Sequence, residues 1–127
     1  LNGPSWEFHS SGQIMIHNQW SKGLRNGLEL TFDQAGKKIK STTWLDGRLH
    51  GEELVYYPTG VVQKRTIWSL NLKHGLSIWY HDNSIEAAIY PYSRGKIDGD
   101  VIYFDSNGLE VSRKEYQNNE LIKKIKR

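Results

Sequence analysis

The sequence predicts an all-β protein, an elongated antiparallel sheet of five tandem 24-residue β-hairpins. Three observations predict this fold class. Twelve Gly, five Trp and seven Tyr occur among 127 residues, and glycine with aromatic residues is typical of short strands joined by tight turns. The same residue types recur every 24 residues. Within each interval, apolar residues lie two residues apart, as side chains on one face of a strand do.

Five positions keep the 24-residue period without an insertion, which indicates one repeat domain over residues 1–127. The ladders are Gly3, Gly27, Gly51, Gly75 and Gly99; Phe8, Phe32, Tyr56, Tyr80 and Phe104; Gly12, Gly36, Gly60, Ser84 and Gly108; Trp20, Trp44, Trp68, Tyr92 and Tyr116; and Gly23, Gly47, Asn71, Gly95 and Asn119. The units are residues 3–26, 27–50, 51–74, 75–98 and 99–122, and a basic tail follows at 123–127.

Each unit is expected to contain two strands. An apolar ladder two residues before the Phe/Tyr ladder should share its face; it consists of Trp6, Leu30, Leu54, Ile78 and Ile102. Turns such as Pro58-Thr59-Gly60 and Asp46-Gly47 close the strands, because Gly and Asn adopt the positive φ of hairpin turns. One hairpin cannot bury enough apolar surface to be stable. We therefore expect ten antiparallel strands in one twisted sheet, with the aromatic ladders on its concave or packed side.

Three features depart from the repeat. Ser84 replaces the glycine of a hairpin turn. Pro91 falls in the second strand of the fourth unit, where it removes a hydrogen-bond donor, so we expect an edge or a local break there. The first unit carries Pro4 directly after its glycine, and atypical end units are typical of caps on repeat arrays.

Composition sets few limits on function. The net charge of +3 permits an acidic partner without requiring one. Four of the seventeen basic residues lie in residues 121–127, which we interpret as a solvated end, with docking to a membrane surface or nucleic acid as alternatives. No apolar run approaches the roughly 20 residues that cross a bilayer. The absence of cysteine fits the bacterial cytoplasm but also permits the periplasm, since the chain begins with Leu1 and a leader could have been removed.

The repeat motif resembles a known family. Gly51-x-x-Leu54-x-Tyr56-Tyr57-x-x-Gly60 is similar to the MORN repeat, as are the recurring segments 47–51 and 95–99. More narrowly, the motif resembles the bacterial variant found in YwqK-like antitoxin proteins. The resemblance extends from residue 3 to about 121. It implies the hairpin architecture, and it implies an immunity or antitoxin protein that neutralises a cognate toxin or secreted effector by binding it.

The residues give no sign of an enzyme. His50 and His74 share one repeat position and His9 and His81 another, so we assign them structural roles. The sequence has no His-x-x-x-His spacing, serine elbow or phosphate-binding glycine loop. We predict no catalytic, cofactor-binding or metal-binding residues.

A binding surface is the better prediction. In units three to five, aromatic and apolar residues occupy first-strand positions that should face away from the ladders, which is typical of a contact surface. The candidate partner-binding residues are Val55, Tyr57, Trp79, His81 and Tyr103. The alternative is that the chain's own tail or curvature covers them. Lys38, Lys40, Lys64 and Arg65 could form a basic stripe or a solvated face.

The leading hypothesis is thus a non-enzymatic module whose partner is a toxin or effector protein. A membrane- or phospholipid-associated scaffold is the alternative, with the basic tail and stripe supplying the attraction. Nucleic acid is not expected as a partner, because +3 is a small charge for binding phosphates and acidic residues are scattered through every unit.

Overall fold

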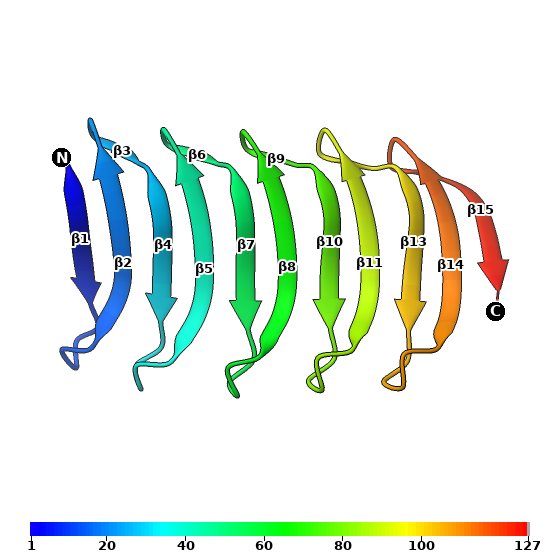
Figure 1. The fold of residues 1–127 in the computed structure, drawn as a ribbon, viewed down its shortest axis with the longest axis horizontal. Helices are drawn as coiled ribbons and strands as arrows, with labels where there is room; N and C mark the ends of the chain where they lie inside the picture. Colours follow the sequence, from blue (N-terminus) through cyan, green and yellow to red (C-terminus); the bar gives the residue numbers. More distant parts are fainter. Residues whose placement is uncertain (127) are drawn as a thin grey trace.

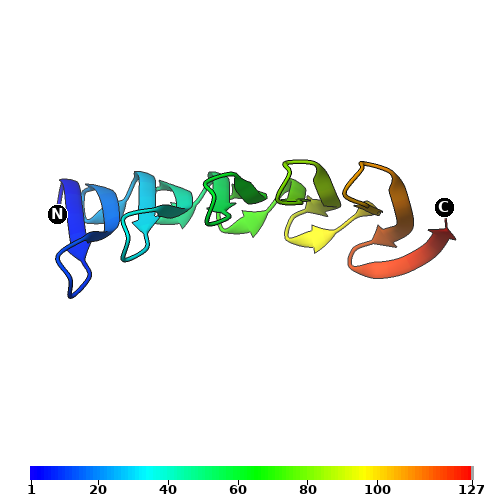
Figure 2. The ribbon, with the colours of Figure 1, turned by 90° about the horizontal axis from the view of Figure 1, so that it is seen from below.

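The chain forms one antiparallel sheet, which confirms the predicted fold class (Figure 1). The computed structural model describes residues 1–126. These residues form fifteen strands and no helix. The chain termini lie at opposite ends of a single row of hairpins, which Figure 2 shows from below.

All ten expected strands are present. They are β1 (Gly3–Phe8), β2 (Ile14–Ser21), β4 (Gly27–Phe32), β5 (Lys38–Leu45), β7 (Gly51–Tyr56), β8 (Val62–Ser69), β10 (Gly75–Tyr80), β11 (Glu86–Ser93), β13 (Gly99–Phe104) and β14 (Glu110–Gln117). Five further strands were not expected. They are the two-residue strands β3 (Leu24–Arg25), β6 (Arg48–Leu49), β9 (Leu72–Lys73) and β12 (Lys96–Ile97), and the terminal β15 (Glu120–Lys126).

Each long hairpin closes with the same turn, the hairpin turn. In the first unit the N–H of His9 donates to the carbonyl of Gln13 at 2.8 Å, and Gly12 has a φ of +92°. The fourth unit has Ser84 at this position with a φ of +70°. This conformation costs a residue with a side chain about 1–2 kcal/mol.

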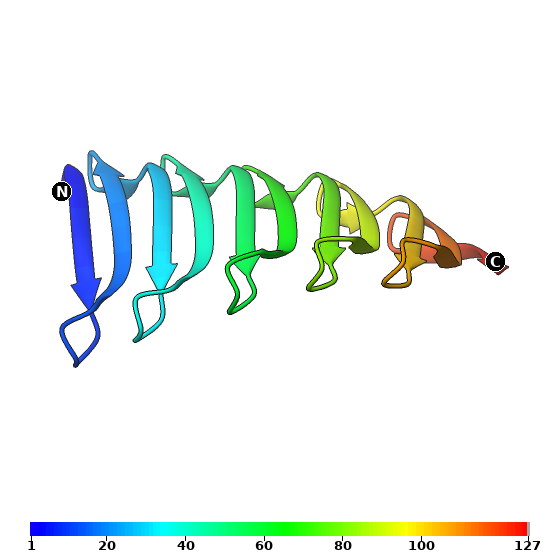
Figure 3. The same ribbon diagram turned by 60° about the horizontal axis from the view of Figure 1, so that its bottom comes forward.

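A second turn, the junction turn, joins each unit to the next. Both central residues have positive φ, +46° at Asp46 and +81° at Gly47, as in a type I′ turn. The N–H of Gly47 also donates to the carbonyl of Arg25 in the preceding unit at 2.8 Å, so successive junction turns stack on one another. Hairpin turns line one long edge of the sheet and junction turns the other (Figure 3).

The glycine that begins each unit adopts a positive φ and, from the second unit on, leaves room for a side chain of the preceding unit. Gly99 has a φ of +122°, and a Cβ there would lie 3.1 Å from Cγ of Pro91. Pro91 does not interrupt β11, so the expected edge or break is wrong. Its carbonyl accepts the N–H of Asp98 at 2.9 Å. N–H and C=O of one residue point to the same side of an antiparallel strand. The missing donor therefore faces this junction and not the hairpin partner β10.

The cross-strand register gives the sheet two different faces. Trp20 lies opposite Gly3, whereas Trp6 lies opposite His17. Because side chains alternate along a strand, the Trp20 and Trp6 ladders are on opposite faces. The expectation that the aromatic ladders share one side is therefore wrong. We call the face of Trp20 and its repeat equivalents the tryptophan face, and that of Trp6, Leu30 and their equivalents the leucine face.

The tryptophan face is the more buried of the two. Of the seven buried residues in the part of the chain that the structure describes, six lie on this face. They are Asn18, Thr42, Thr66, Ser77, Ala88 and Val101. The sheet has no second layer, so side chains on the same face cover these residues, as happens on the inside of a bend. Trp6 on the leucine face is 49% exposed.

The expected basic tail continues the sheet as far as the structure describes it. β15 pairs with β14 from Gln117↔Glu120 to Ser112↔Lys126. The backbone of this end is therefore paired as far as Lys126, the side chains of Leu121 to Lys124 are exposed to solvent, and Arg127 lies outside the described residues.

Candidate docking face

The tryptophan face begins with a row of indole N–H groups that donate to acceptors on the neighbouring strand of the same hairpin. Trp20 Nε1 donates to Oγ of Ser5 at 2.7 Å. Trp68 Nε1 donates to Oε1 of Glu53 at 3.3 Å, and Trp44 makes the equivalent bond to Glu29. In units four and five tyrosine replaces tryptophan, and this acceptor position holds Ser77 and Val101. Glutamate occupies the acceptor position only in units two and three.

Basic side chains in units two and three are paired with these glutamates. Nε of Arg25 lies 3.4 Å from Glu29, and Nζ of Lys40 lies 3.6 Å from Glu53. The guanidinium of Arg25 is also 5.2 Å from the ring centre of Trp20 and 5.2 Å from that of Trp44. This half of the face is therefore close to neutral.

Three lysines further along the face stack on aromatic rings. Nζ of Lys64 is 4.5 Å from the ring centre of Trp79, and Nζ of Lys73 is 5.0 Å from that of Tyr92. Lys114 lies 5.9 Å from the ring of Tyr103. Among the residues that the structure describes, none of the three lysines has a carboxylate within ion-pair distance.

A hollow of about 210 Å³ lies between these side chains. We call it the lysine hollow; its lining residues are Lys64, Lys73, Ser77, Trp79, Tyr90 and Tyr92. Burial and then the charge of Lys73 lower the pKa of Lys64, and Glu53 opposes them. Burial raises the pKa of the Tyr92 hydroxyl. The hollow thus holds positive charge in a partly desolvated setting.

The five predicted partner-binding residues fall into two groups. Val55, Trp79 and Tyr103 lie on the tryptophan face, where the hydroxyl of Tyr103 is 2.6 Å from that of Tyr90. Tyr57 and His81 instead lie in hairpin turns, beyond the ends of β7 and β10.

These two turn residues tie one unit to the next. The hydroxyl of Tyr57 donates to the carbonyl of Tyr80 at 2.6 Å, and Nε2 of His81 donates to that of Phe104 at 3.0 Å. The sequence placed all five residues on one surface, whereas the structure brings three together. The partner that they would bind stays a prediction.

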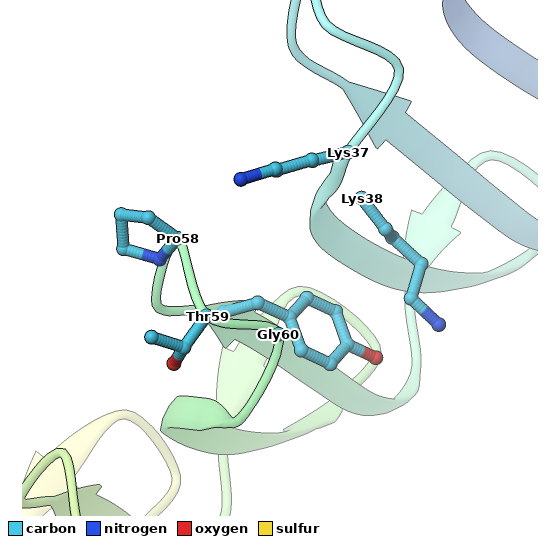
Figure 4. A pocket seen from close by; sticks show the side chains of 6 residues that line it. Lys37, Lys38, Pro58, Thr59 and Gly60 are labelled. Carbon is cyan, nitrogen blue, oxygen red and sulfur yellow. The ribbon is translucent and has the colours of Figure 1, made fainter.

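The predicted basic stripe is not continuous. Lys40 and Lys64 lie on the tryptophan face, whereas Arg65 lies on the leucine face, where it pairs with Glu52 at 3.0 Å. Nζ of Lys38 stacks at 4.7 Å over the Tyr56 ring. Lys38 and Lys37 line an open hollow of about 350 Å³ beside the turn of Pro58, Thr59 and Gly60 (Figure 4).

Four of the five histidines have backbone partners, and His17 stacks on the ring of Trp6. Nδ1 of His50 accepts the N–H of Leu70 at 3.2 Å, and His74 does the same for Arg94 at 3.3 Å. Nε2 of His9 donates to the Phe32 carbonyl at 3.0 Å, and His81, at the same repeat position, makes the equivalent bond to Phe104. In residues 1–126 no three His, Cys, Asp or Glu side chains gather as a metal site would require, and no helix is long and apolar enough to span a bilayer.

Comparisons with known proteins give three results. No curated protein matches the chain. The crystal structure of TarM is similar over 94% of this chain and 20% of its own, with 16% identity and a TM-score of 0.49. The chain therefore spans about a fifth of the length of TarM. Residues 49–68, from the end of β6 to Trp68 in β8, match the family description "MORN repeat variant", so the chain carries a MORN repeat there.

Proposed function

We propose that the chain is a non-enzymatic protein-binding module that docks its partner on the C-terminal half of the tryptophan face. One observation carries the proposal. At a single repeat position, Glu7 and Thr31 in the first two units give way to Val55, Trp79 and Tyr103 in the last three. Trp79 is 39% exposed on a sheet that no other described element covers. Tryptophan and tyrosine are the side chains that contribute most to binding energy at protein interfaces.

The architecture supports this use. Every strand described belongs to one continuous hydrogen-bonded sheet, so little backbone ordering is needed when a partner binds. A MORN repeat at residues 49–68 fits a repeat-based binding module.

We further propose that the partner is a bacterial toxin or secreted effector and that the chain is its immunity protein. The support for this step is the resemblance of the 24-residue motif to YwqK-like antitoxin proteins.

Calorimetric titration against the protein encoded beside this chain's gene tests both steps. We expect a Kd in the nanomolar range. Trp79→Ala should weaken binding by about tenfold or more. Leu76→Ala is the matched control, because Leu76 lies on the leucine face of the same strand and is 49% exposed. No binding would contradict the immunity role, and equal losses in the two variants would contradict the docking face.

A further inference from the structure

The lysine hollow lies where one repeat position holds a serine in place of a glutamate. The position that holds Glu29 and Glu53 in units two and three holds Ser77 in unit four. In unit three this position provides an ion-pair partner for Lys40. Lys64 lies at the same repeat position as Lys40, 24 residues further along. The residue of the next unit that corresponds to Glu53 is Ser77, so Lys64 has no glutamate there to pair with.

Ser77, which also lines the hollow, has a hydroxyl without a hydrogen-bond partner among residues 1–126. The residue is 3% exposed, and its Oγ has no hydrogen-bond partner in the part of the chain that the structure describes. A buried hydroxyl without a partner is costly unless a ligand or water supplies one. Lys64 and Lys73 also line the hollow, and neither has a carboxylate within ion-pair distance among the described residues. Three residues that can donate hydrogen bonds thus line one space.

We propose that the lysine hollow receives a carboxylate side chain from an acidic segment of the protein partner. The proposal rests on the proposed function, since it assumes a protein partner. Lys64 and Lys73 would pair with the carboxylate, and Ser77 would donate a hydrogen bond to it. The rings of Trp79, Tyr90 and Tyr92 form apolar walls suited to the methylene groups of a glutamate. The partner would thus supply the carboxylate that Glu29 and Glu53 provide in units two and three.

The size and position of the hollow favour a protein side chain over a lipid surface. At about 30 Å³ per water molecule, 210 Å³ holds about seven waters, which is enough for one side chain. A bilayer would instead require an extended basic surface. On the leucine face, Arg65 pairs with Glu52, and Arg113 pairs with Asp100 and Glu110. Those cations are therefore already neutralised.

A capped hexaglutamate peptide is the probe, and capped hexaglutamine is its control. Binding is followed by NMR of the whole chain, at the Trp79 indole N–H and the lysine ε-methylene groups. Lys64→Gln removes one ammonium. Ser77→Glu introduces the glutamate that units two and three carry at this repeat position, so it should fold, and its side chain should fill the hollow. Lys40→Gln is the matched control, since Lys40 shares the repeat position of Lys64 but is paired with Glu53.

We expect hexaglutamate to shift the Trp79, Lys64 and Lys73 signals. Lys64→Gln and Ser77→Glu should lower its affinity by about tenfold or more, as removal of a paired buried charge does, and Lys40→Gln should change it less than about twofold. Equal losses in Lys40→Gln and Lys64→Gln would show diffuse attraction and overturn the proposal. Shifts produced by inorganic phosphate or phosphatidylserine vesicles, with none produced by hexaglutamate, would overturn it in favour of a phosphate ligand.

Titration with the protein partner distinguishes failure of the acid-binding site from failure of the proposed function. If it binds the wild-type chain and the Ser77→Glu variant equally, the hollow is not its site, and the docking role itself stands. If hexaglutamate fills the hollow and the adjacent gene product does not bind, the acid-binding site stands and the immunity role fails.

Discussion

Replacing Gly99 with alanine should destabilise the array more than replacing Gly75, although both glycines begin a unit. Their φ angles are +122° and +101°, so alanine carries about 1–3 kcal/mol of backbone strain at either position. A Cβ on Gly75 would lie 3.7 Å from Cβ of Ile67, an ordinary van der Waals contact. A Cβ on Gly99 would lie 3.1 Å from Cγ of Pro91, so the ring must move. An overpacked contact of this kind adds about 1–2 kcal/mol.

Urea unfolding followed by far-ultraviolet circular dichroism measures the difference. We expect Gly99→Ala to lower the free energy of unfolding by about 1–2 kcal/mol more than Gly75→Ala. Adding Pro91→Ala to Gly99→Ala removes the clashing atom, and the double variant should recover about 1 kcal/mol relative to the sum of the single changes. Losses within about 0.5 kcal/mol of each other, or additive effects in the double variant, would contradict a clash between a Cβ at residue 99 and Pro91.

Three further predictions follow from named contacts. Ser84→Gly should raise the free energy of unfolding by about 1 kcal/mol, because it removes a side chain from a φ of +70°; thermal unfolding measures this. Glu53→Gln should lower the free energy of unfolding by about 1–2 kcal/mol, since its carboxylate accepts two partly buried hydrogen bonds, whereas Glu52→Gln should lower it by less than about 1 kcal/mol at an exposed ion pair; urea midpoints compare them. Burial and then the hydrogen bond to Tyr90 raise the pKa of Tyr103. The folded chain therefore keeps this proton above pH 10.0, where the unfolded chain loses it, and stability should fall as the pH rises through that range. In a tyrosinate absorbance titration, Tyr90→Phe should lower the pKa of Tyr103.

Glycine and asparagine made the turns predictable from the sequence. A positive φ is a local property, so Gly47, Gly95 and Asn119 predicted junction turns that the structure confirms. Pro91 was misjudged because its effect depends on which neighbour its nitrogen faces, and that is a property of the register. The two-residue strands were not expected, because a pair such as Leu24-Arg25 is too short to show periodicity.

The face of the sheet on which each side chain lies could not be predicted from the sequence, because a β-bulge shifts the residue pairing between the two strands of a hairpin. Glu7 pairs with Ile16 but Phe8 with Ile14, so β2 has one extra residue near the hairpin turn. One inserted residue reverses which face every later side chain takes relative to the partner strand. Counting across the turn without it places Trp20 on the face of Trp6. The lysine hollow depends on the true assignment, so residue counting alone could not find it.

The direction of the strands determines how the array would respond to a pulling force. Strands run across the long axis (Figure 1), so a load applied at the two ends falls on the hydrogen bonds between units in series. Two residue pairs join β5 to β7, whereas six join β7 to β8 within a hairpin. The joints between units should therefore yield before the hairpins. Each event would free only the residues of one junction, such as 46–50, adding about 17 Å of extended chain at roughly 3.4 Å per residue.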